Sequence, residues 1–313
     1  MRPIMVKGKR SRVAARLIDF AGLLTARIHH RGFYNLTQFV AQCAPKGQNC
    51  VIELASDSKY QIDLRDPYWN RLIYAGFAYE PELEHVLKYL AEVPYVFIDG
   101  GANGGYWSIL ASSRQFGSHS AVAFEPIPKT FDRLVVNRRL NDCRFEIDRR
   151  ALSEHGSQRL VMKVKTTGPS SVAGASLVDG DVVGQGYENV EVETVSLDTI
   201  LESIPDERPV LLKLDIEGVE APVLDSSKHI AERDFLVVYE DHGKDYQCTS
   251  SAWVLAQGWP VFFIHDSGQI QSVRDLNSVR HLKSRRHRGY NFISTTKNSS
   301  FHEKLDGLID VPQ

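Results

Sequence analysis

The stretch VFIDGGANGGYW, residues 96–107, carries the strongest signal of fold in this chain. An apolar run ends at Asp99 and is followed by glycines at positions 100, 101, 104 and 105. Glycine takes the positive φ angles that a tight turn requires, and Asn103 is among the few other residues that tolerate them. The pattern predicts a strand, a tight turn and a helix beginning near Tyr106, with backbone amides that suit a ligand with an anionic end.

Downstream of residue 95, apolar segments of strand length alternate with helical patterns, which predicts a mainly parallel sheet covered by helices on both faces. Seven segments have the character of strands, enough for one open sheet: 95–99, 120–125, 144–152, 210–216, 235–240, 260–265 and 290–295. A Gly-, Ser- and Val-rich excursion, 165–190, is expected between an extra strand pair at 159–165 and 189–195. Long loops are often lids, and an insertion without a role is the alternative.

Residues 1–92 have a different pattern, and we expect them to form a lead-in before a main domain at 93–313. A helix, a strand pair at 50–56 and 59–65 and a helix at 81–93 are expected here. The basic N-terminus precedes LIDFAGLLTARI, 17–28, which is shorter than the roughly 18 apolar residues of a membrane helix. We expect no integral membrane segment and favour a docked amphipathic helix, with a peripheral membrane contact or targeting signal as the alternative.

The bulk composition is that of an ordinary globular protein, with 313 residues, 42% of them apolar and 24% charged. The formal charge of −2 gives no general attraction to nucleic acid, so no nucleic-acid partner is expected. The four cysteines lie at 43, 50, 143 and 248 and lack the paired spacing of a zinc site. We expect them to be reduced thiols in a cytoplasmic protein.

Glu125 supplies the second chemical signal. It ends the strand in AVAFEP, about twenty residues after the first turn, where a carboxylate can accept both hydroxyls of a bound ribose. Nicotinamide cofactors and S-adenosylmethionine both contain adenosine, so this residue alone does not separate them. The glycine spacing does, because it fits neither the G-x-G-x-x-G pyrophosphate fingerprint nor the G-x-x-x-x-G-K-[ST] phosphate loop. The turn therefore suits a carboxylate and an amine better than two phosphates.

Six segments together resemble, in order, the motifs of FkbM-family methyltransferases: FIDGGANGGYWS, AVAFEP, RRALSEHGSQ, VSLDTIL, LLKLDIEGVE and FLVVYED. The resemblance spans residues 95–242, and YEPELEHVL at 79–87 is similar to the lead-in of that family. It implies a class I, Rossmann-like α/β fold whose seven-stranded, mainly parallel sheet has an antiparallel last strand. It also implies S-adenosylmethionine as cofactor and methyl transfer, usually to a hydroxyl oxygen of a sugar or another small natural product.

Carried over by motif, the resemblance implies the residues that hold the cofactor. Asp99, Gly101, Asn103 and Gly105 would line its methionine part, and Glu125 would take the ribose. Arg150 and Ala151 fall where such enzymes contact adenine. The remaining members of the expected set are Ala102, Tyr106, Pro126, Asp215 and Glu217. The family often has an aliphatic residue where this chain has Gly104, so the turn is expected to be looser here.

The strand in LLKLDIEGVE, 211–220, ends among carboxylates on the expected acceptor side. Strand alternation would place Lys213, Asp215 and Glu217 on one side. The ends of parallel strands form the ligand crevice of open α/β sheets, which favours a functional Asp215. For Lys213, a buried ion pair that braces the sheet is the alternative.

The following strand leads into Glu240, Asp241 and His242, which are expected near the same crevice. Methyl transfer from a sulfonium is an in-line displacement, so the protein positions the acceptor oxygen and removes its proton. His242 is the favoured base because the ordinary pKa of histidine is close to neutrality. Asp215 is the alternative base, with His242 then orienting the acceptor.

The expected partner is a small-molecule or carbohydrate acceptor. The basic segment RHLKSRRHR, 280–288, favours acceptors that bear phosphate, with a solvated face as the alternative. No metal is expected, although clustered carboxylates at 215, 217, 240 and 241 leave a divalent ion as an alternative. Two other functions stay open: a non-catalytic module that binds S-adenosylmethionine, and an oxidoreductase that uses a nicotinamide cofactor.

Overall fold

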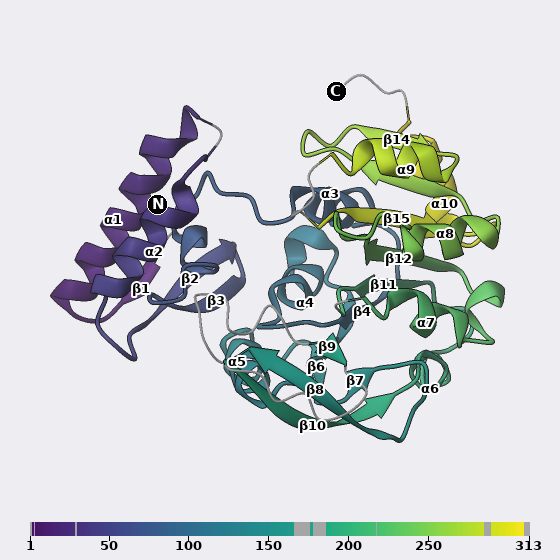
Figure 1. Cartoon of the computed structure of the whole chain (residues 1–313), viewed down its shortest axis with the longest axis horizontal. Coiled ribbons are helices and arrows are strands. Elements are labelled where there is room, and N and C mark those ends of the chain that lie inside the picture. The colour runs from purple at the N-terminus through teal and green to yellow at the C-terminus, as the bar shows by residue number, and fades with distance from the viewer. Residues whose placement is uncertain are drawn as a thin grey trace.

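The computed structural model describes residues 2, 4–28, 30–165, 176–177, 186–216, 218–284 and 289–309. These residues form an α/β fold in which a large sheet lies between helices (Figure 1). A pair of helices near the N-terminus lies at one end of the molecule, and the last helices of the chain lie at the other.

The main sheet has eight strands within the described residues, in the order β14-β13-β15-β12-β11-β4-β5-β6. Neighbours from β6 to β12 are parallel, while β15 runs antiparallel to both β12 and β13. The predicted class, the mainly parallel sheet and the antiparallel last strand are thereby confirmed, and β14 adds an eighth strand at the edge. The strands are β4 (Val96–Gly100), β5 (Ser120–Phe124), β6 (Glu146–Asp148), β11 (Val210–Leu214), β12 (Phe235–Glu240), β13 (Val261–Ile264), β14 (Ile270–Val273) and β15 (Asn291–Thr295).

The single strand expected at 144–152 is divided, so that part of the prediction is wrong. The Arg150 amide donates to the Asp148 carboxylate at 2.9 Å, which turns the chain directly after β6. β7 (Ala151–Leu152) then pairs with β10 in a second sheet instead of continuing along β5.

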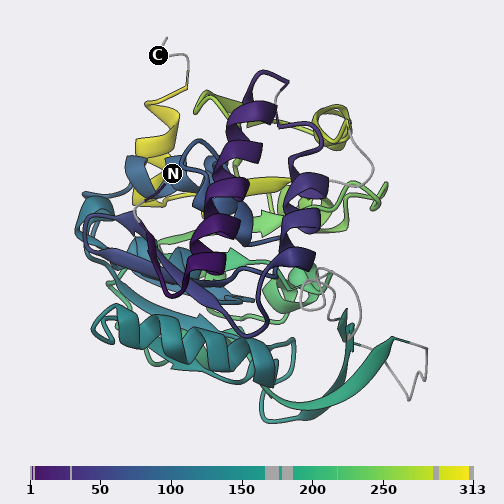
Figure 2. The same ribbon diagram turned by 90° about the vertical axis from the view of Figure 1, so that its left-hand side faces the viewer.

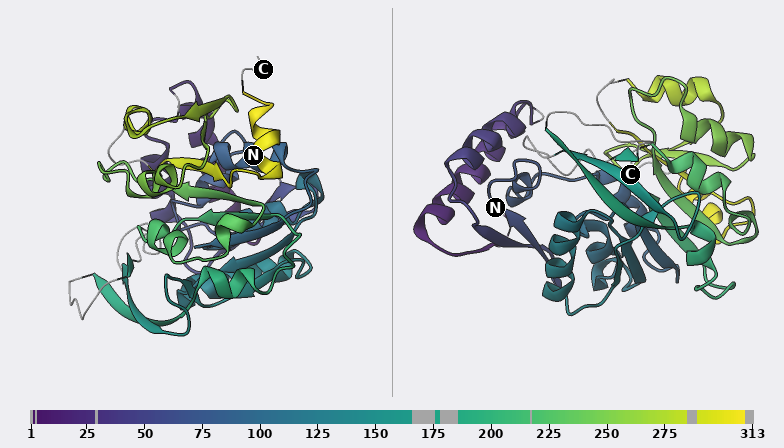
Figure 3. Two further views of the ribbon diagram at one scale, coloured as in Figure 1. Left: turned by 90° about the vertical axis from the view of Figure 1, so that its right-hand side faces the viewer. Right: turned by 60° about the horizontal axis from the view of Figure 1, so that its bottom comes forward.

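This second sheet has the order β7-β10-β8-β9 and contains the strand pair predicted around the excursion. β8 (Arg159–Lys165) and β10 (Tyr187–Val195) pair antiparallel, and β9 (Ser176–Leu177) pairs with β8. The pair projects from the body of the molecule (Figures 2 and 3). Most of the excursion, for which a lid and an insertion without a role were both open, lies outside the described residues, at 166–175 and 178–185.

The lead-in contains the predicted strand pair and the helix that follows it. β1 (Ile4–Val6), β2 (Asn49–Ala55) and β3 (Ser58–Asp63) form a three-stranded antiparallel sheet. Two helices connect β1 to β2: α1 (Lys9–Ala26) and α2 (Phe33–Cys43). The 3₁₀ turn Asn70–Ile73 and α3 (Pro81–Tyr89) lead into the main sheet.

The remaining helices mostly connect strands of the main sheet, as the alternating pattern predicted. Their starts follow ordinary signals: Pro128 opens α5, and the side chains of Ser196 and Asp275 cap α6 and α9. These helices are α4 (Tyr106–Ala111), α5 (Pro128–Leu140), α6 (Leu197–Leu201), α7 (Glu220–Asp225), α8 (Thr249–Ala256), α9 (Leu276–Leu282) and α10 (Ser300–Asp306), with 3₁₀ turns at Arg114–Phe116 and Ile230–Glu232.

Each face of the main sheet has its own apolar core, because successive side chains of a strand point to opposite faces. On β4, Phe97 belongs to one core and Ile98 to the other. The core around Phe97 also contains Tyr60 and Trp69 of the lead-in, so lead-in and main sheet share one continuous cluster of buried side chains. None of the described helices combines the length and the apolarity that a membrane crossing requires.

Candidate functional site

A cavity of about 420 Å³ lies where β4, β5, β11 and β12 end. Parallel strands place their C-terminal ends at one edge, and open α/β sheets bind ligands there. The wall also includes residues of the lead-in and Met162 from β8. The lining residues are Tyr68, Trp69, Tyr79, Glu80, Gly101, Ala102, Asn103, Tyr106, Trp107, Phe124, Glu125, Pro126, Ile127, Ala151, Leu152, Met162, Lys213, Asp215, Ile216, Val219, Glu240 and His242.

The glycine-rich turn after β4 forms one wall and leads into α4 at Tyr106, as predicted. Its amides are already bonded within the protein, which differs from the expected open cradle. Gly101 and Ala102 both donate to the carbonyl of Phe124, at 3.1 and 2.9 Å. Gly104 donates to the side-chain oxygen of Asn103, and Gly105 to the carbonyl of Ala102. The turn is thus held rigidly by hydrogen bonds within the protein.

Two glycines of this turn are required by close approaches. Gly101 has φ +76°, and a Cβ there would lie 2.0 Å from the carbonyl oxygen of Asp215 at the end of β11. Gly104 has no such φ, but a Cβ would lie 2.3 Å from the hydroxyl of Tyr60. The expectation of a looser turn at Gly104 is therefore wrong, because the lead-in fills the space that an aliphatic side chain would occupy.

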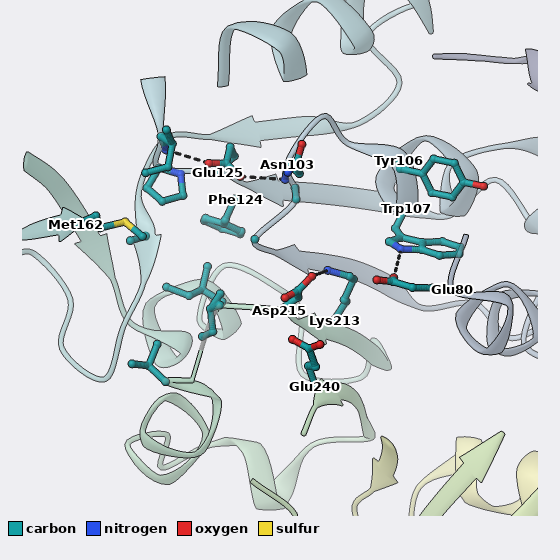
Figure 4. Close-up of a pocket in the computed structure, with 18 of the residues that line it drawn as sticks. Glu80, Asn103, Tyr106, Trp107, Phe124, Glu125, Met162, Lys213, Asp215 and Glu240 are labelled. Carbon is teal, nitrogen blue, oxygen red and sulfur yellow. Dashed lines mark hydrogen bonds and ion pairs between the residues drawn. The ribbon is translucent and has the colours of Figure 1, made fainter. Parts of the chain in front are cut away.

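Glu125 lies in the cavity wall directly after β5 and is 6% exposed. Its two carboxylate oxygens accept from the amides of Asn103, at 2.9 Å, and Ile127, at 3.0 Å (Figure 4). Burial raises the pKa of Glu125 to about 7, against the opposing influence of these two amides. Each oxygen keeps a further lone pair with which it can accept a hydroxyl from a ligand.

Lys213 forms the centre of a buried charge cluster beneath the cavity. Its Nζ lies 3.4 Å from Asp215 and 3.9 Å from Asp99. Asp99 also accepts from the hydroxyl and amide of Ser108, which fixes the start of α4 against β4. Burial lowers the pKa of Lys213, but the carboxylates of Asp215, Asp99 and Glu80 outweigh it and hold that pKa above its ordinary value. The lysine therefore stays charged and braces the strand ends.

Glu80 approaches the same cluster from the lead-in. Trp107 donates its indole N–H to the Glu80 carboxylate at 2.7 Å (Figure 4). Removal from bulk water raises the pKa of Glu80 to about 7, while Lys213 opposes this and Asp215 adds to it. Glu80 has φ +45°, a conformation that non-glycine residues seldom adopt outside functional or strained positions. Figure 4 shows Glu80, Lys213, Asp215 and Glu240 directed toward one region of the cavity.

The end of β12 splits the three polar residues that were expected together. Glu240 and His242 line the cavity, whereas Asp241 is buried on the other side and pairs with Lys283. The backbone N–H of Lys244 donates to Nδ1 of His242 at 3.2 Å. This hydrogen bond engages Nδ1, so that ring nitrogen of His242 is not available to take a proton from an acceptor.

The basic segment expected to attract phosphate is only partly described. Lys283 is buried by its pair with Asp241, and Arg280 donates to the carbonyl of Tyr246. Residues 285–288 lie outside the described part of the chain. The described basic residues of this segment thus anchor the connection to β15, and Lys283 is not on the acceptor side.

Most residues proposed for cofactor binding line the cavity, and the exceptions have structural reasons. Asp99 lies beneath the cavity wall with Lys213 and Ser108, and Gly105 packs against Leu134. Arg150 pairs with Asp148 and faces a separate pocket. Glu217 lies outside the described residues. Those that line the cavity are Gly101, Ala102, Asn103, Tyr106, Glu125, Pro126, Ala151 and Asp215, together with the proposed catalytic His242.

Sequence reasoning missed the aromatic wall and its carboxylate. Tyr68, Trp69 and Tyr79 come from the lead-in, and Trp107 from α4. Only the motif YEPELEHVL pointed toward this region, because it contains Tyr79 and Glu80. No local pattern indicated Met162, which reaches the cavity through the pairing of β8 with β10.

Several solved structures are similar to this chain, each with a TM-score below 0.5. A precorrin-6y C5,15-methyltransferase from Geobacter metallireducens has 11% identity and a TM-score of 0.38, with 69% of this chain and 87% of that chain covered. A methyltransferase FkbM from Methylobacillus flagellatus has 16% identity and a TM-score of 0.40, with 88% of this chain and 60% of that chain covered. A putative RNA methyltransferase from Pyrococcus horikoshii has 13% identity and a TM-score of 0.35, with 70% of this chain and 83% of that chain covered.

Comparison with curated proteins found no match. Among family models, that of the methyltransferase FkbM domain matches residues 99–280, more than half of the chain. The matched range begins at Asp99 on β4 and contains Glu125, Lys213 and the polar residues at the end of β12. The chain therefore belongs to the FkbM methyltransferase family.

Proposed function

We propose that this protein is an S-adenosylmethionine-dependent O-methyltransferase that acts on a hydroxyl of a sugar or another small natural product. The observation that carries the proposal is the acidic, partly aromatic cavity at the strand ends of a chain in a methyltransferase family. The volume, about 420 Å³, falls within the roughly 300–1,000 Å³ of small-molecule pockets.

The residues present fit S-adenosylmethionine. Among the residues that the structure describes, four carboxyl side chains line the cavity: Glu80, Glu125, Asp215 and Glu240. Such a lining suits a ligand that carries a sulfonium and an ammonium group, because opposite charges attract strongly where water is excluded. Glu125 retains lone pairs for the ribose hydroxyls, and Ala151, Leu152 and Met162 offer apolar surface for adenine.

The bound cofactor would supply an electrophilic methyl group, and the protein would contribute positioning and a proton acceptor. Glu80 is the proton acceptor that we favour, because its pKa of about 7 leaves a substantial ionised fraction at neutral pH. Asp215 is the weaker choice, since its carboxylate lies 3.4 Å from Lys213. His242 lines the same cavity and would orient the acceptor.

The aromatic wall supports a carbohydrate acceptor. Tyr68, Trp69 and Tyr79 present ring faces and edges on the lead-in side of the cavity, and their neighbours Glu80 and Glu240 can accept from hydroxyls. Aromatic rings bind the apolar faces of sugars, while carboxylates bind their hydroxyls. We also propose a cytoplasmic location, because the four cysteines are free thiols, as is usual for proteins of that reducing compartment.

The test is transfer of a labelled methyl group from S-adenosylmethionine to a panel of sugars, nucleotide sugars, polyketides, lipids and RNA. We expect labelled sugar or natural product, with mass spectrometry placing the methyl on oxygen. Label on nitrogen or in RNA would refute the proposed acceptor but leave the methyltransferase function standing. Calorimetry with S-adenosylhomocysteine and NAD separates the cofactors, and binding of NAD alone would refute the proposal.

A further inference from the structure

α1 presents its large apolar side chains to solvent. Val13, Leu17, Phe20 and Leu24 recur at helical spacing and are 49%, 49%, 61% and 61% exposed. A helix that only covers a core turns its apolar stripe inward. Here the buried face consists mainly of small residues: Ser11, Ala14, Ala15, Ile18, Ala21, Gly22 and Thr25.

Close packing fixes this orientation of α1. Gly22 lies against the ring of Tyr74, and a Cβ at this glycine would be 2.3 Å from Cγ of that ring. Ala15 and Ile18 join the same buried cluster as the lead-in sheet. A rotation that buried Phe20 would push a large aromatic side chain into the tight contact between Gly22 and Tyr74, so the outward stripe is built into the fold.

The apolar surface continues beyond the stripe. α1 and α2 lie side by side at one end of the molecule and face the viewer in Figure 2. Four further exposed residues belong to this pair and its connection: Leu23 at 57%, Ile28 at 52%, Leu36 at 39% and Phe39 at 68%. We call these eight residues the outer face. Isolated exposed apolar residues are ordinary, but a group of this size on two adjacent helices marks an interaction surface.

The charge around the outer face is predominantly positive. Residues 1–50 contain nine Lys and Arg and a single acidic residue, Asp19, whereas the whole chain has a net charge of −2. Arg12 and Arg16 are exposed and directly precede Val13 and Leu17, which places them beside the apolar stripe, about 100° around the helix. Their guanidinium groups can extend past the apolar side chains.

We propose that the outer face docks on an anionic phospholipid surface, with α1 lying in the plane of the interface. Helices that bind in this way combine an apolar stripe of Leu and Phe with flanking Lys and Arg. The apolar side chains enter the boundary of the acyl chains, and the basic residues meet lipid phosphates. This proposal concerns a surface separate from the cavity and does not depend on the function proposed for it.

Other occupants fit this surface less well. A symmetric second copy would bring the basic surface of one chain against the basic surface of the other. Nucleic acid would neutralise the charge but leave Leu17, Phe20 and Leu24 exposed to water, since phosphates and sugars offer them little apolar surface. Only an anionic lipid surface satisfies both the apolar and the basic side chains.

The experiment is flotation of the full-length protein with vesicles of phosphatidylcholine alone or of phosphatidylcholine mixed with phosphatidylglycerol. We expect binding to the mixed vesicles that weakens as salt rises from about 0.05 to 0.5 M, because screening reduces the attraction of exposed charges. Replacement of both Arg12 and Arg16 by Gln should weaken binding about tenfold or more. The double change Leu17→Ser and Phe20→Ser should weaken it at least as much, because both apolar anchors are lost.

Tyr246→Ser is the matched control, because Tyr246 is 65% exposed but lies far from α1 in the chain. It should bind vesicles like the unchanged protein, and circular dichroism should show that all variants remain folded. Light scattering determines whether the protein forms a dimer, and a gel shift with RNA determines whether it binds nucleic acid. Three results would overturn the proposal: a protein that binds neither vesicle type, a dimer that the Leu17 and Phe20 changes abolish, or binding to RNA alone.

Discussion

Glu125 combines a structural and a ligand-binding position in one carboxylate. It holds the turns that contain Asn103 and Ile127, yet it lines the cavity and has a pKa of about 7. Its ionised form accepts hydrogen bonds more strongly than its protonated form. The state of this one proton should therefore affect both ligand affinity and stability.

Glu125→Gln should weaken binding of S-adenosylhomocysteine about 10- to 100-fold, because a hydrogen bond to a charged acceptor is lost. In the unchanged protein, affinity should rise as the pH passes through about 7, and the variant should lack this rise. Folding raises this pKa above its ordinary 4.5, so stability is lost as the pH climbs from 4.5 through about 7. Calorimetry and urea unfolding across this range check both effects.

Glu146→Gln is the control for this change, because Glu146 lies on the neighbouring strand with its side chain 76% exposed. It should leave affinity and its pH dependence unchanged. Equal affinity of the Glu125 variant and the unchanged protein would remove Glu125 from the binding site.

Glu80 should determine the pH dependence of turnover. As the pH rises through about 7 the carboxylate ionises, so kcat/KM should rise over the same interval. Glu80→Gln should lower turnover about 100-fold or more and leave affinity for S-adenosylhomocysteine nearly intact. Trp107→Phe removes a hydrogen bond that lowers the pKa of Glu80, and should move the rise to higher pH.

His242→Ala compares His242, the base favoured from the sequence, with Glu80, the base favoured from the structure. It should lower turnover without changing cofactor affinity, and the rise near pH 7 should persist. Glu84→Gln is the matched control on α3, because the Glu84 carboxylate pairs with Lys88 on the surface. If the His242 variant lost the rise of kcat/KM near pH 7 and the Glu80 variant kept normal turnover, His242 would be the base that takes the proton of the acceptor.

Gly101 tests how closely the first turn approaches β11. Gly101→Ala should cost about 3 kcal/mol or more, because it adds a severe clash with the Asp215 carbonyl to the strain of φ +76°. Gly32→Ala has nearly the same φ, +77°, with no atom within 4 Å of the new Cβ. It should cost only about 1 kcal/mol. Urea unfolding measures both values, and equal losses would show that backbone strain alone requires glycine at 101.

At the scale of elements, two asparagines of α5 connect the lead-in to the first turn. Asn137 accepts from the amide of Gln61 on β3 at 2.8 Å and donates to the carbonyl of Gly104 at 2.7 Å. Asn141 bonds both backbone groups of Lys59. The side chains of α5 thus complete the edge of β3, as a neighbouring strand would.

Asn137→Ala should destabilise the protein by about 2–4 kcal/mol, because the buried Gly104 carbonyl and the partly buried Gln61 amide lose their partners. Hydrogen exchange at the Gln61 amide should accelerate, and urea unfolding gives the free energy. Asn277→Ala, at an exposed position of α9, should cost far less. An equal effect of the two changes would contradict the role of Asn137 as a connector.

At the scale of the whole molecule, the lead-in and the main sheet share one core. Tyr60, Trp69 and Leu83 belong to the same cluster as Phe97 and Trp107. Removal of residues 1–92 would expose one face of α4 to water. The boundary predicted at 92–93 therefore does not separate two independent cores.

The full chain should unfold in one urea transition, with far-UV circular dichroism and tryptophan fluorescence giving the same midpoint. A fragment of residues 93–313 should fail to reach the folded state, because the aromatic side chains of α4 would lose the residues that bury them. Two separate transitions, or a folded fragment, would show that the main domain is stable without the lead-in.

The strands and the first turn could be predicted because the sequence patterns that specify them each extend over only a few residues. Alternation of apolar segments gave seven strands of the main sheet, and the glycines and Asn103 predicted the turn before α4. The division of 144–152 was missed because it depends on the hydrogen bond between Asp148 and the Arg150 amide and on pairing with β10. β10 is more than 30 residues away, so no local pattern reports it.

The sequence by itself determined the fold class, the family and the strand ends where a ligand would bind, since these follow from short-range periodicity and contiguous motifs. Only the tertiary structure decided which side chains line the cavity. It turned Asp241 toward Lys283, placed Asp99 beneath the wall and brought Glu80 and the aromatic residues of the lead-in beside Asp215. These placements depend on side-chain direction and on packing between segments far apart in the chain, which VFIDGGANGGYW alone does not encode.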